Sequence, residues 1–257
     1  MHSFFTRNKV PRHLDRAQAK LIDFNIFSSR TAKLSSVKPV IAIDGPAGAG
    51  KSTVSKLIAH ELSLSYLDTG AMYRCLAFRA LAAGLTVEDG AQAAELMDKL
   101  HISFGVGEPQ PVFINGVDVT ADIRTPEIGE AASALSQFTP VRQRMVALQQ
   151  EIVKGGGVIL EGRDVTTVVA PDATLKIYLT ASLEERAKRR QREFMEKGMD
   201  AGFQDVRNQI EQRDHRDINR DDSPLKVADD AIVVESADRS PEEVAAKIIS
   251  HLKAKLQ

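Results

Sequence analysis

The sequence predicts an α/β fold, with helices flanking a parallel sheet, a small antiparallel β-containing insert and a helical lid. Short apolar runs alternate with helical stretches from residue 40 onward, which is typical of strand, helix, strand units. These runs are apolar throughout, as expected for strands that helices cover on both faces. One segment with two β-like runs interrupts the alternation and predicts the insert.

Four apolar runs are the candidate strands of the parallel sheet: residues 40–43, 157–160, 175–180 and 231–235. The antiparallel insert is expected over residues 101–120, where an Asn-Gly step suits a tight hairpin turn between two β-like runs. The insert therefore separates the first half of the α/β core from the second.

Several helix starts carry capping residues. The last helix is expected from Ser240, where a serine N-cap, a proline and a glutamate form a capping box, to about Lys255. Residues 182–185 repeat the serine and glutamate pattern after a candidate strand. Thr-Pro steps at 125–126 and 139–140 predict two further helix starts.

The composition is that of an ordinary globular protein and excludes several classes. At 257 residues the chain can bury a full core. A formal net charge of -1 gives no reason to expect nucleic acid or a membrane as partner, and no charge-free stretch approaches the length of a membrane span. The single cysteine, Cys75, excludes a disulfide framework and a cysteine-based metal site. A reducing, cytoplasmic location is therefore expected.

Residues 1–36 form a basic leader, with seven Lys or Arg against two acidic residues. Organelle targeting is one interpretation, although the apolar region that secretion requires is missing. A disordered tail, or a start codon placed too early, is the favoured interpretation because basic tails are common. The folded domain is expected over residues 38–257.

Residues 45–52 match the pattern G-x-x-x-x-G-K-[ST], with an apolar strand before them and a helical stretch after them. Backbone N–H groups of such a loop turn toward one point and, with the helix N-terminus, hold a di- or triphosphate. Lys51 would reach the β- and γ-phosphates of ATP, and the Ser52 hydroxyl would bind Mg²⁺ directly. The predicted nucleotide-binding residues of this P-loop are Gly45, Pro46, Ala47, Gly48, Ala49, Gly50, Lys51, Ser52 and Thr53.

The loop alone fits a kinase, a GTPase, an ATPase motor or a non-hydrolysing sensor. No Asn-Lys-x-Asp-like run follows, which argues against a common GTPase. The run at 157–160 leads into Glu161, Arg163 and Asp164, at the carboxyl end of a strand, where α/β sheets usually place ligands. Glu161 would order Mg²⁺ through water, Arg163 would hold a phosphate and Asp164 would accept from an amino group; a salt-bridged loop is the alternative.

Further arginines predict an anion site. Arg74 lies beside small hydroxyl and glycine residues, which suits a phosphate monoester, although a solvated arginine is the simpler interpretation in isolation. On a later helix, the apolar face of residues 203–210 continues into Arg213, Asp217 and Arg220. Charges on an inward stripe are costly unless a charged ligand fills the space, so a phosphate-lined cleft is predicted; a solvated helix end is the alternative.

Three arginines upstream, Arg186, Arg189 and Arg190, share one helix face because they are spaced i, i+3 and i+4. A loop over residues 196–202 with two glycines follows them and would act as a hinge. We therefore predict a lid over about residues 188–222 that offsets the charge of transferring phosphates and excludes water.

Together with the β-like insert, five motifs resemble the bacterial-type cytidylate kinases of the nucleoside monophosphate kinase group: GPAGAGKST, LDTGAMYR, EGRDVTTVVAPDA, SLEERAKRR and RDHRDINR. The resemblance runs from about Val40 to the C-terminus. It implies transfer of the γ-phosphoryl group of ATP to CMP or dCMP with Mg²⁺, in pyrimidine metabolism, by a core, a monophosphate-binding insert (about 98–155) and a lid. We expect a monomer without nucleic-acid or membrane partners. A kinase of UMP, AMP or shikimate, or a non-catalytic nucleotide-binding module, is the alternative.

The resemblance also implies roles for single residues. Arg74 and Arg163 would grip the acceptor phosphate, and Arg213 with Asp217 would hold the sugar. The cytosine would be read by Thr69, Ser133, Arg142, Asp164 and Arg220. Catalysis would be supported by Lys51, Arg163, Arg186, Arg190 and Arg213. Two positions depart from the family pattern, which often has Asp where Glu161 stands and commonly has Gly where Thr166 stands.

Overall fold

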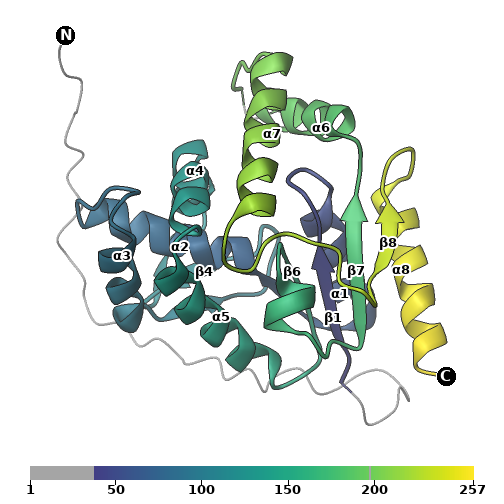
Figure 1. Ribbon diagram of the computed structural model, residues 1–257. Helices are drawn as coiled ribbons and strands as arrows, with labels where there is room; N and C mark the ends of the chain where they lie inside the picture. Colours follow the sequence, from purple (N-terminus) through teal and green to yellow (C-terminus); the bar gives the residue numbers. More distant parts are fainter. Residues whose placement is uncertain (1–37, 197) are drawn as a thin grey trace. The chain divides into compact units, whose positions relative to one another are not determined.

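The computed structural model describes residues 38–196 and 198–257, so the predictions for the leader lie outside the described residues. Five strands form a central sheet in the order β2-β6-β1-β7-β8 (Figure 1). All neighbouring pairs are parallel, which confirms the predicted sheet. The strands are β1 (Val40–Asp44), β2 (Ser65–Asp68), β6 (Val158–Gly162), β7 (Leu175–Thr180) and β8 (Ile232–Glu235).

Helices cover both faces of this sheet, as the continuous apolar runs predict. In β1, Ile41 and Ile43 pack with α1 and α8, whereas Ala42 between them packs with α2 and α5 on the other face. Successive side chains of a strand point to opposite faces, so both sets must be apolar. The helices on the two faces are α1 (Lys51–Leu62), α2 (Thr69–Ala82), α5 (Thr139–Val153) and α8 (Pro241–Lys255).

The predicted antiparallel insert is present as a three-stranded sheet in the order β3-β4-β5. Its hairpin turn is the Asn115-Gly116 step, where both residues have positive φ (51° and 81°) and Ile114 pairs with Val117. Two further helices accompany the insert. These elements are α3 (Gly90–Leu96), β3 (Ile102–Phe104), β4 (Val112–Ile114), β5 (Val117–Asp118) and α4 (Pro126–Leu135).

Two helices, α6 (Leu183–Glu196) and α7 (Phe203–Asn219), lie side by side beyond the carboxyl end of β7 (Figure 1). They pack through a small apolar cluster that includes Phe194, Val206 and Ile210. The predicted capping box of α8 is confirmed, since Ser240 Oγ accepts from the Glu243 N–H at 3.2 Å and the Glu243 carboxylate accepts from the Ser240 N–H at 2.8 Å. Within the described ranges, no helix is long and apolar enough to cross a membrane.

Candidate active site

A cleft of about 1030 Å³ opens at the carboxyl ends of the parallel strands. Its walls come from the loop before α1, from α2 and α4, and from α6 and α7. Pockets for a single drug-sized ligand measure about 300–1,000 Å³, so this cleft lies at the upper end of that range. All predicted site residues line it except Gly45, Pro46 and Arg186.

The loop between β1 and α1 curls around the ammonium group of Lys51. Gly45 has a φ of 151°, and a side chain there would meet the carbonyl oxygen of Leu179 at 1.9 Å, so only glycine fits. Lys51 is buried, and its Nζ donates to the carbonyl oxygens of Gly45 (2.7 Å) and Pro46 (2.9 Å). Burial, and then the charge of Arg163, lower the pKa of Lys51. A phosphate chain bound here would stabilise the charged ammonium.

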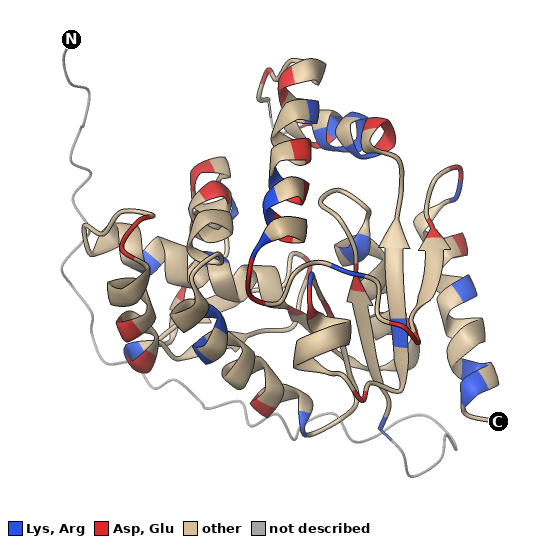
Figure 2. Cartoon of the chain, viewed as in Figure 1, with Lys and Arg blue, Asp and Glu red and all other residues tan. Residues whose placement is uncertain are grey.

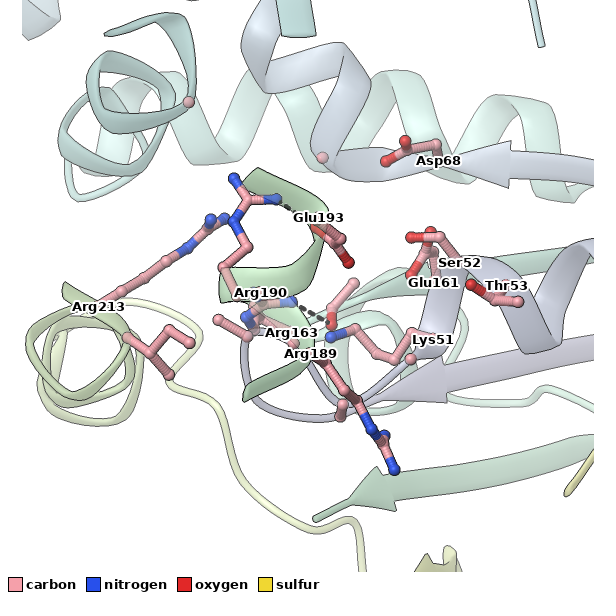
Figure 3. A pocket seen from close by; sticks show the side chains of 18 of the residues that line it. Lys51, Ser52, Thr53, Asp68, Glu161, Arg163, Arg189, Arg190, Glu193 and Arg213 are labelled. Atoms are coloured by element: carbon pink, nitrogen blue, oxygen red, sulfur yellow. Dashed lines mark hydrogen bonds and ion pairs between the residues drawn. The ribbon is translucent and has the colours of Figure 1, made fainter. Parts of the chain in front are cut away.

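Ser52 and Glu161 lie beside Lys51, and Asp68 lies beyond them in the same cleft (Figure 3). Tyr66 Oη donates to Glu161 Oε1 at 2.5 Å and so fixes that carboxylate. Burial, and then the charge of Asp68, raise the pKa of Glu161. Hydroxyl and carboxylate oxygens are ligands that Mg²⁺ prefers, and a cation would relieve the repulsion between the two carboxylates. This donor set therefore fits Mg²⁺, although the described part of the chain holds no group of three or more His, Cys, Asp or Glu arranged for a metal.

Four arginines line the same cleft: Arg74, Arg163, Arg190 and Arg213. Figure 2 shows the basic residues along α6 and α7, and Figure 3 shows Arg190 and Arg213 beside Arg163. Arg163 Nε donates to Asp217 at 2.8 Å, whereas Arg213 Nε is buried without a hydrogen-bond partner among residues 38–196 and 198–257. Burial, then the charges of Arg163, Arg74 and Arg190, lower the pKa of Arg213 to about 10. An anion relieves such repulsion, so this arginine cluster suits a phosphate group.

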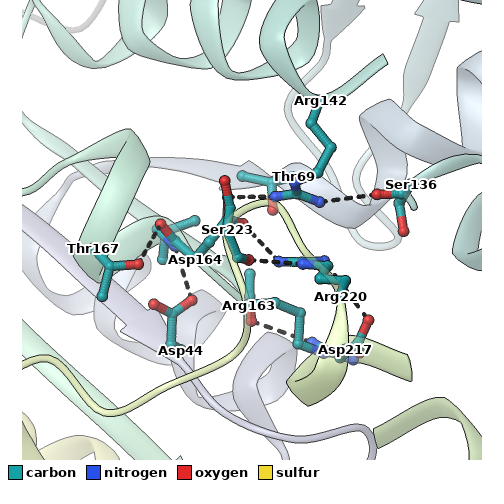
Figure 4. A network of polar contacts seen from close by, with 12 residues as sticks. Asp44, Thr69, Ser136, Arg142, Arg163, Asp164, Thr167, Asp217, Arg220 and Ser223 are labelled. Carbon is teal, nitrogen blue, oxygen red and sulfur yellow. Dashed lines mark hydrogen bonds and ion pairs between the residues drawn. The ribbon is translucent and has the colours of Figure 1, made fainter. Parts of the chain in front are cut away.

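A second polar network lies in the same cleft (Figure 4). Arg142 donates to the Asp164 carboxylate and, at 3.2 Å, to the carbonyl oxygen of Ser136. Arg220 Nη2 lies 3.6 Å from Asp164 Oδ1. Among the described residues, Ser133 Oγ, Arg142 Nε and Arg220 Nη2 are buried and have no hydrogen-bond partner. Buried polar atoms are nearly always satisfied in native proteins, so these three atoms indicate a polar ligand.

Asp44, the last residue of β1, holds the loop that carries Asp164. Its Oδ1 accepts from the Val165 N–H at 3.0 Å, and its Oδ2 accepts from the N–H and the hydroxyl of Thr166 at 2.7 and 2.6 Å. Burial raises the pKa of Asp44 to about 6, while the hydrogen bonds from Thr166 act in the opposite direction. Thr166, one of the two departures from the family pattern, thus supplies a hydroxyl donor to a buried carboxylate.

The three arginines on α6 do not act as one group. Arg189 and Arg190 line the cleft, and Arg189 donates to Ser236 Oγ at 3.0 Å and to its carbonyl oxygen at 2.7 Å. Arg186 is buried away from the cleft, with its guanidinium donating to the carbonyl oxygen of Ala47 at 3.0 Å. The spacing of the three residues therefore does not place Arg186 beside the phosphates.

Several residues that line the cleft were not predicted, among them Asp68, Ser136 and Ser236. Asp68 ends β2, a strand that was not predicted, and it caps α2 by accepting from the N–H of Ala71 at 2.9 Å. Its position after a strand and before a helix was the available indication. The next residue, Thr69, is among the predicted site residues, and its hydroxyl donates to the carbonyl oxygen at position 161 at 2.6 Å.

The P-loop motif lies between β1 and α1, and the cleft lies over the carboxyl ends of a parallel sheet. Together these two features define a P-loop nucleotide-binding protein. The chain belongs to the cytidylate kinase family, whose model, described as Cytidylate kinase, matches residues 41–254. The cytidylate kinase of Bacillus cereus (strain B4264) is 48% identical over 211 residues, which cover 82% of this chain and 94% of the relative. The cytidylate kinase of Bacillus thuringiensis (strain Al Hakam) is 48% identical over 210 residues, 81% of this chain and 93% of the relative. The chain is thus a member of a family of phosphotransferases.

Among solved structures, a shikimate kinase from Acinetobacter baumannii in complex with shikimate aligns with 85% of this chain and 94% of that chain, at 17% identity and a TM-score of 0.41. A shikimate kinase from Bacteroides thetaiotaomicron aligns with 84% of this chain and 98% of that chain, at 12% identity and a TM-score of 0.45. Both TM-scores are low, and no conclusion on function follows from them.

Proposed function

We propose that this protein transfers the γ-phosphoryl group of ATP to CMP or dCMP, giving ADP and CDP or dCDP. The observation that carries the proposal is the arginine cluster that shares one cleft with the P-loop, because two anion sites in one cleft can hold two phosphate-bearing molecules. Membership of the cytidylate kinase family supports the same reaction. An oxygen of the acceptor phosphate attacks the γ-phosphorus directly, so no covalent enzyme intermediate is required.

On the donor side, the backbone N–H groups of residues 48–53 cradle the phosphates of ATP, and Lys51 contacts the β- and γ-phosphates. Arg163, whose charge acts on Lys51, and Arg190, which lines the same cleft, offset the charge that develops on the transferring group. The Arg163 guanidinium is held in place by its hydrogen bond to Asp217, so little reorganisation of this residue accompanies the reaction.

Ser52, Asp68 and Glu161 are the residues that would hold Mg²⁺, with Ser52 as a direct ligand and the carboxylates acting through water. The cation supplies charge neutralisation between the phosphates of ATP. Tyr66 keeps the Glu161 carboxylate turned toward Ser52, because its hydroxyl donates to one of the two carboxylate oxygens.

On the acceptor side, the polar network around Asp164 matches cytosine. The exocyclic amino group of cytosine is a donor and suits the Asp164 carboxylate, whereas its ring carbonyl and ring nitrogen are acceptors and suit Ser133 and Arg142. Uracil has a carbonyl oxygen in place of that amino group and would meet a carboxylate, which disfavours UMP. Thr69 and Arg220 complete the lining of this pocket.

The acceptor phosphate is gripped by Arg74 and Arg163, and the sugar contacts Arg213 and Asp217. Asp217 is buried, and its carboxylate is within reach of both neighbours, Arg163 at 2.8 Å and Arg220 at 3.7 Å. The nearby arginine charges outweigh burial and lower the pKa of Asp217. It therefore stays an acceptor for sugar hydroxyls at neutral pH.

An acceptor panel tests the proposal. ADP release from Mg²⁺ and ATP is followed in a coupled assay with CMP, dCMP, UMP, AMP and shikimate as acceptors. Turnover with CMP and dCMP far above the others is expected. Preference for any other acceptor would contradict the assignment of the base pocket, and ATP binding without ADP production in all arms would indicate a non-catalytic nucleotide-binding module.

The proposal also assigns roles to larger segments. Residues 98–155 carry the acceptor, residues 188–222 act as the lid, and the enzyme works as a cytoplasmic monomer. Sedimentation of the protein with and without both nucleotides tests the oligomeric state, and a dimer in either condition would contradict the monomer.

A further inference from the structure

The backbone of the P-loop is held by two charged residues from helices α6 and α7, which carry most of the proposed lid: Arg186 on α6 and Asp214 on α7. Asp214 Oδ1 accepts from the N–H of Ala47 at 3.0 Å, and Arg186 Nη1 donates to the carbonyl oxygen of Ala47 at 3.0 Å. The two side chains also form an ion pair with each other. One ion pair therefore fixes the peptide groups on both sides of a single loop residue.

This Arg186–Asp214 pair is buried and lies outside the cleft, with side chains only 9% and 11% exposed. The loop also touches the lid helices by packing. A Cβ at Gly48 would lie 3.2 Å from the Cβ of Arg186, and the methyl group of Ala47 belongs to the apolar cluster of α6 and α7. That cluster contains Ala47, Ala187, Phe194, Val206 and Ile210.

Stability alone does not account for such a pair. A buried ion pair contributes little more than well-packed apolar side chains of the same volume, because desolvation offsets the attraction between the charges. Apolar side chains cannot orient a peptide group, however, since orientation requires an acceptor for its N–H and a donor for its carbonyl oxygen. The N–H groups that follow Ala47 in the loop are those that turn toward the phosphates of a nucleotide.

We propose that Arg186 and Asp214 are positioning residues for the donor triphosphate: they fix the orientation of the peptide groups around Ala47 and tie this orientation to the lid helices, without contacting the nucleotide. The inference rests on the proposed kinase function and deepens it. It makes ATP affinity, rather than CMP affinity, the property that depends on this pair.

A neighbouring ion pair provides a matched control. Arg207 on α7 lies 3.5 Å from Glu184 on α6 and joins the same two helices, and among the described residues neither side chain has a hydrogen bond or ion pair to the P-loop. If the Arg186–Asp214 pair only held the helices together, removal of either pair would have a similar kind of effect.

The test compares two double variants. The first combines Arg186→Met and Asp214→Leu, which removes both buried charges at once, and the control combines Glu184→Gln and Arg207→Met. Urea unfolding checks that each is folded, calorimetric titration with a non-hydrolysable ATP analogue and Mg²⁺ gives the donor Kd, and the coupled assay gives KM for ATP and CMP. We expect the Kd and the KM for ATP to rise by about tenfold in the first variant, as expected for two lost backbone contacts, with the KM for CMP within about twofold of the parent. In the control variant, the donor Kd, the KM for ATP and the KM for CMP should each stay within about twofold of the parent value.

Loss of ATP and CMP affinity in parallel, or unchanged ATP affinity, would overturn the inference. Asp214→Asn provides a second reading that does not require the double variant to fold. Its amide can serve Ala47 or Arg186 but not both, so ATP affinity should again fall while CMP affinity holds, and unchanged ATP affinity would count against the inference. The nucleotide titration separates this outcome from failure of the proposed function, which would show as a parent protein that binds ATP but does not phosphorylate CMP.

Discussion

Replacement of Thr166 by Val is the sharpest test of how the base pocket is supported. Thr166 is 1% exposed, and its hydroxyl donates at 2.6 Å to the carboxylate of Asp44, which is fully buried. Valine has nearly the shape of threonine but lacks the donor. A hydrogen bond to a charged group contributes about 1.5–3 kcal/mol, so we expect the free energy of unfolding to fall by about 2 kcal/mol where Asp44 is ionised.

The loss should depend on pH, and its sign follows from the pKa of Asp44. Burial raises that pKa from 3.8 to about 6 in the folded protein, so the carboxyl group's contribution to stability is complete below pH 3.8 and is lost as the pH rises through about 6. Across this window the shift corresponds to about 3 kcal/mol. Removing the Thr166 donor raises the folded pKa further, because that hydrogen bond favours the ionised form. The destabilisation by Thr166→Val should therefore be small at pH 5 and reach its full value at pH 8.

Urea unfolding of the parent and of Thr166→Val at pH 5 and at pH 8 measures the loss in free energy of unfolding at each pH. Thr166→Ser keeps the hydroxyl and should restore most of the loss at pH 8. Thr167→Val is a second control, since the Thr167 hydroxyl donates only to a backbone carbonyl oxygen, at 3.4 Å. Equal destabilisation by Thr166→Val at the two pH values, or destabilisation by Thr166→Ser as large as by Thr166→Val, would refute the reasoning.

Three further substitutions test the proposed site. Lys51→Ala should lower kcat by about 100-fold or more while the Kd for CMP, measured by titration, changes little; turnover of CMP at the parent rate would mean that the loop assignment is wrong. Glu161→Gln should raise the Mg²⁺ concentration for half-maximal activity by about tenfold, and an unchanged Mg²⁺ titration curve would remove Glu161 from the metal site. Arg142→Met removes the hydrogen-bonded partner of the buried Asp164 carboxylate and leaves only Arg220, 3.6 Å away. Unfolding in urea should therefore become easier by about 3 kcal/mol, and the KM for CMP should rise without that for ATP; a rise confined to the KM for ATP would contradict the base pocket.

Much of the fold could be predicted because its elements have strong local patterns. The continuous apolar run of β1 leads into the glycine-rich loop and α1, and Asn115 with Gly116 determines the insert's hairpin. The edge strand β2 was not predicted, since its sequence SYLD is short and only Leu67 is buried. Its other three residues are exposed or half-buried, so β2 lacks the continuous apolar run that marks β1.

The site was predicted unevenly for a similar reason. Arg74, Arg163 and Arg213 could be chosen because charged residues at strand ends or on an apolar helix face are recognisable in one segment, and the structure brings all three to one cleft. Spacing did not reveal that Arg186 turns away from this cleft, because its partners are in distant segments. Asp214 escaped notice because it contacts a backbone N–H far away in sequence, which no local pattern records.

The most direct test of the proposed reaction follows the phosphoryl group itself. The protein is incubated with Mg²⁺, CMP and ATP labelled in its γ-phosphate, and the labelled products are separated. Transfer of the label to CDP, with little in inorganic phosphate, is the predicted result. Label released as inorganic phosphate, or retained in ATP while CMP stays unchanged, would contradict the assignment of the P-loop and the arginine cluster as the two halves of one kinase site.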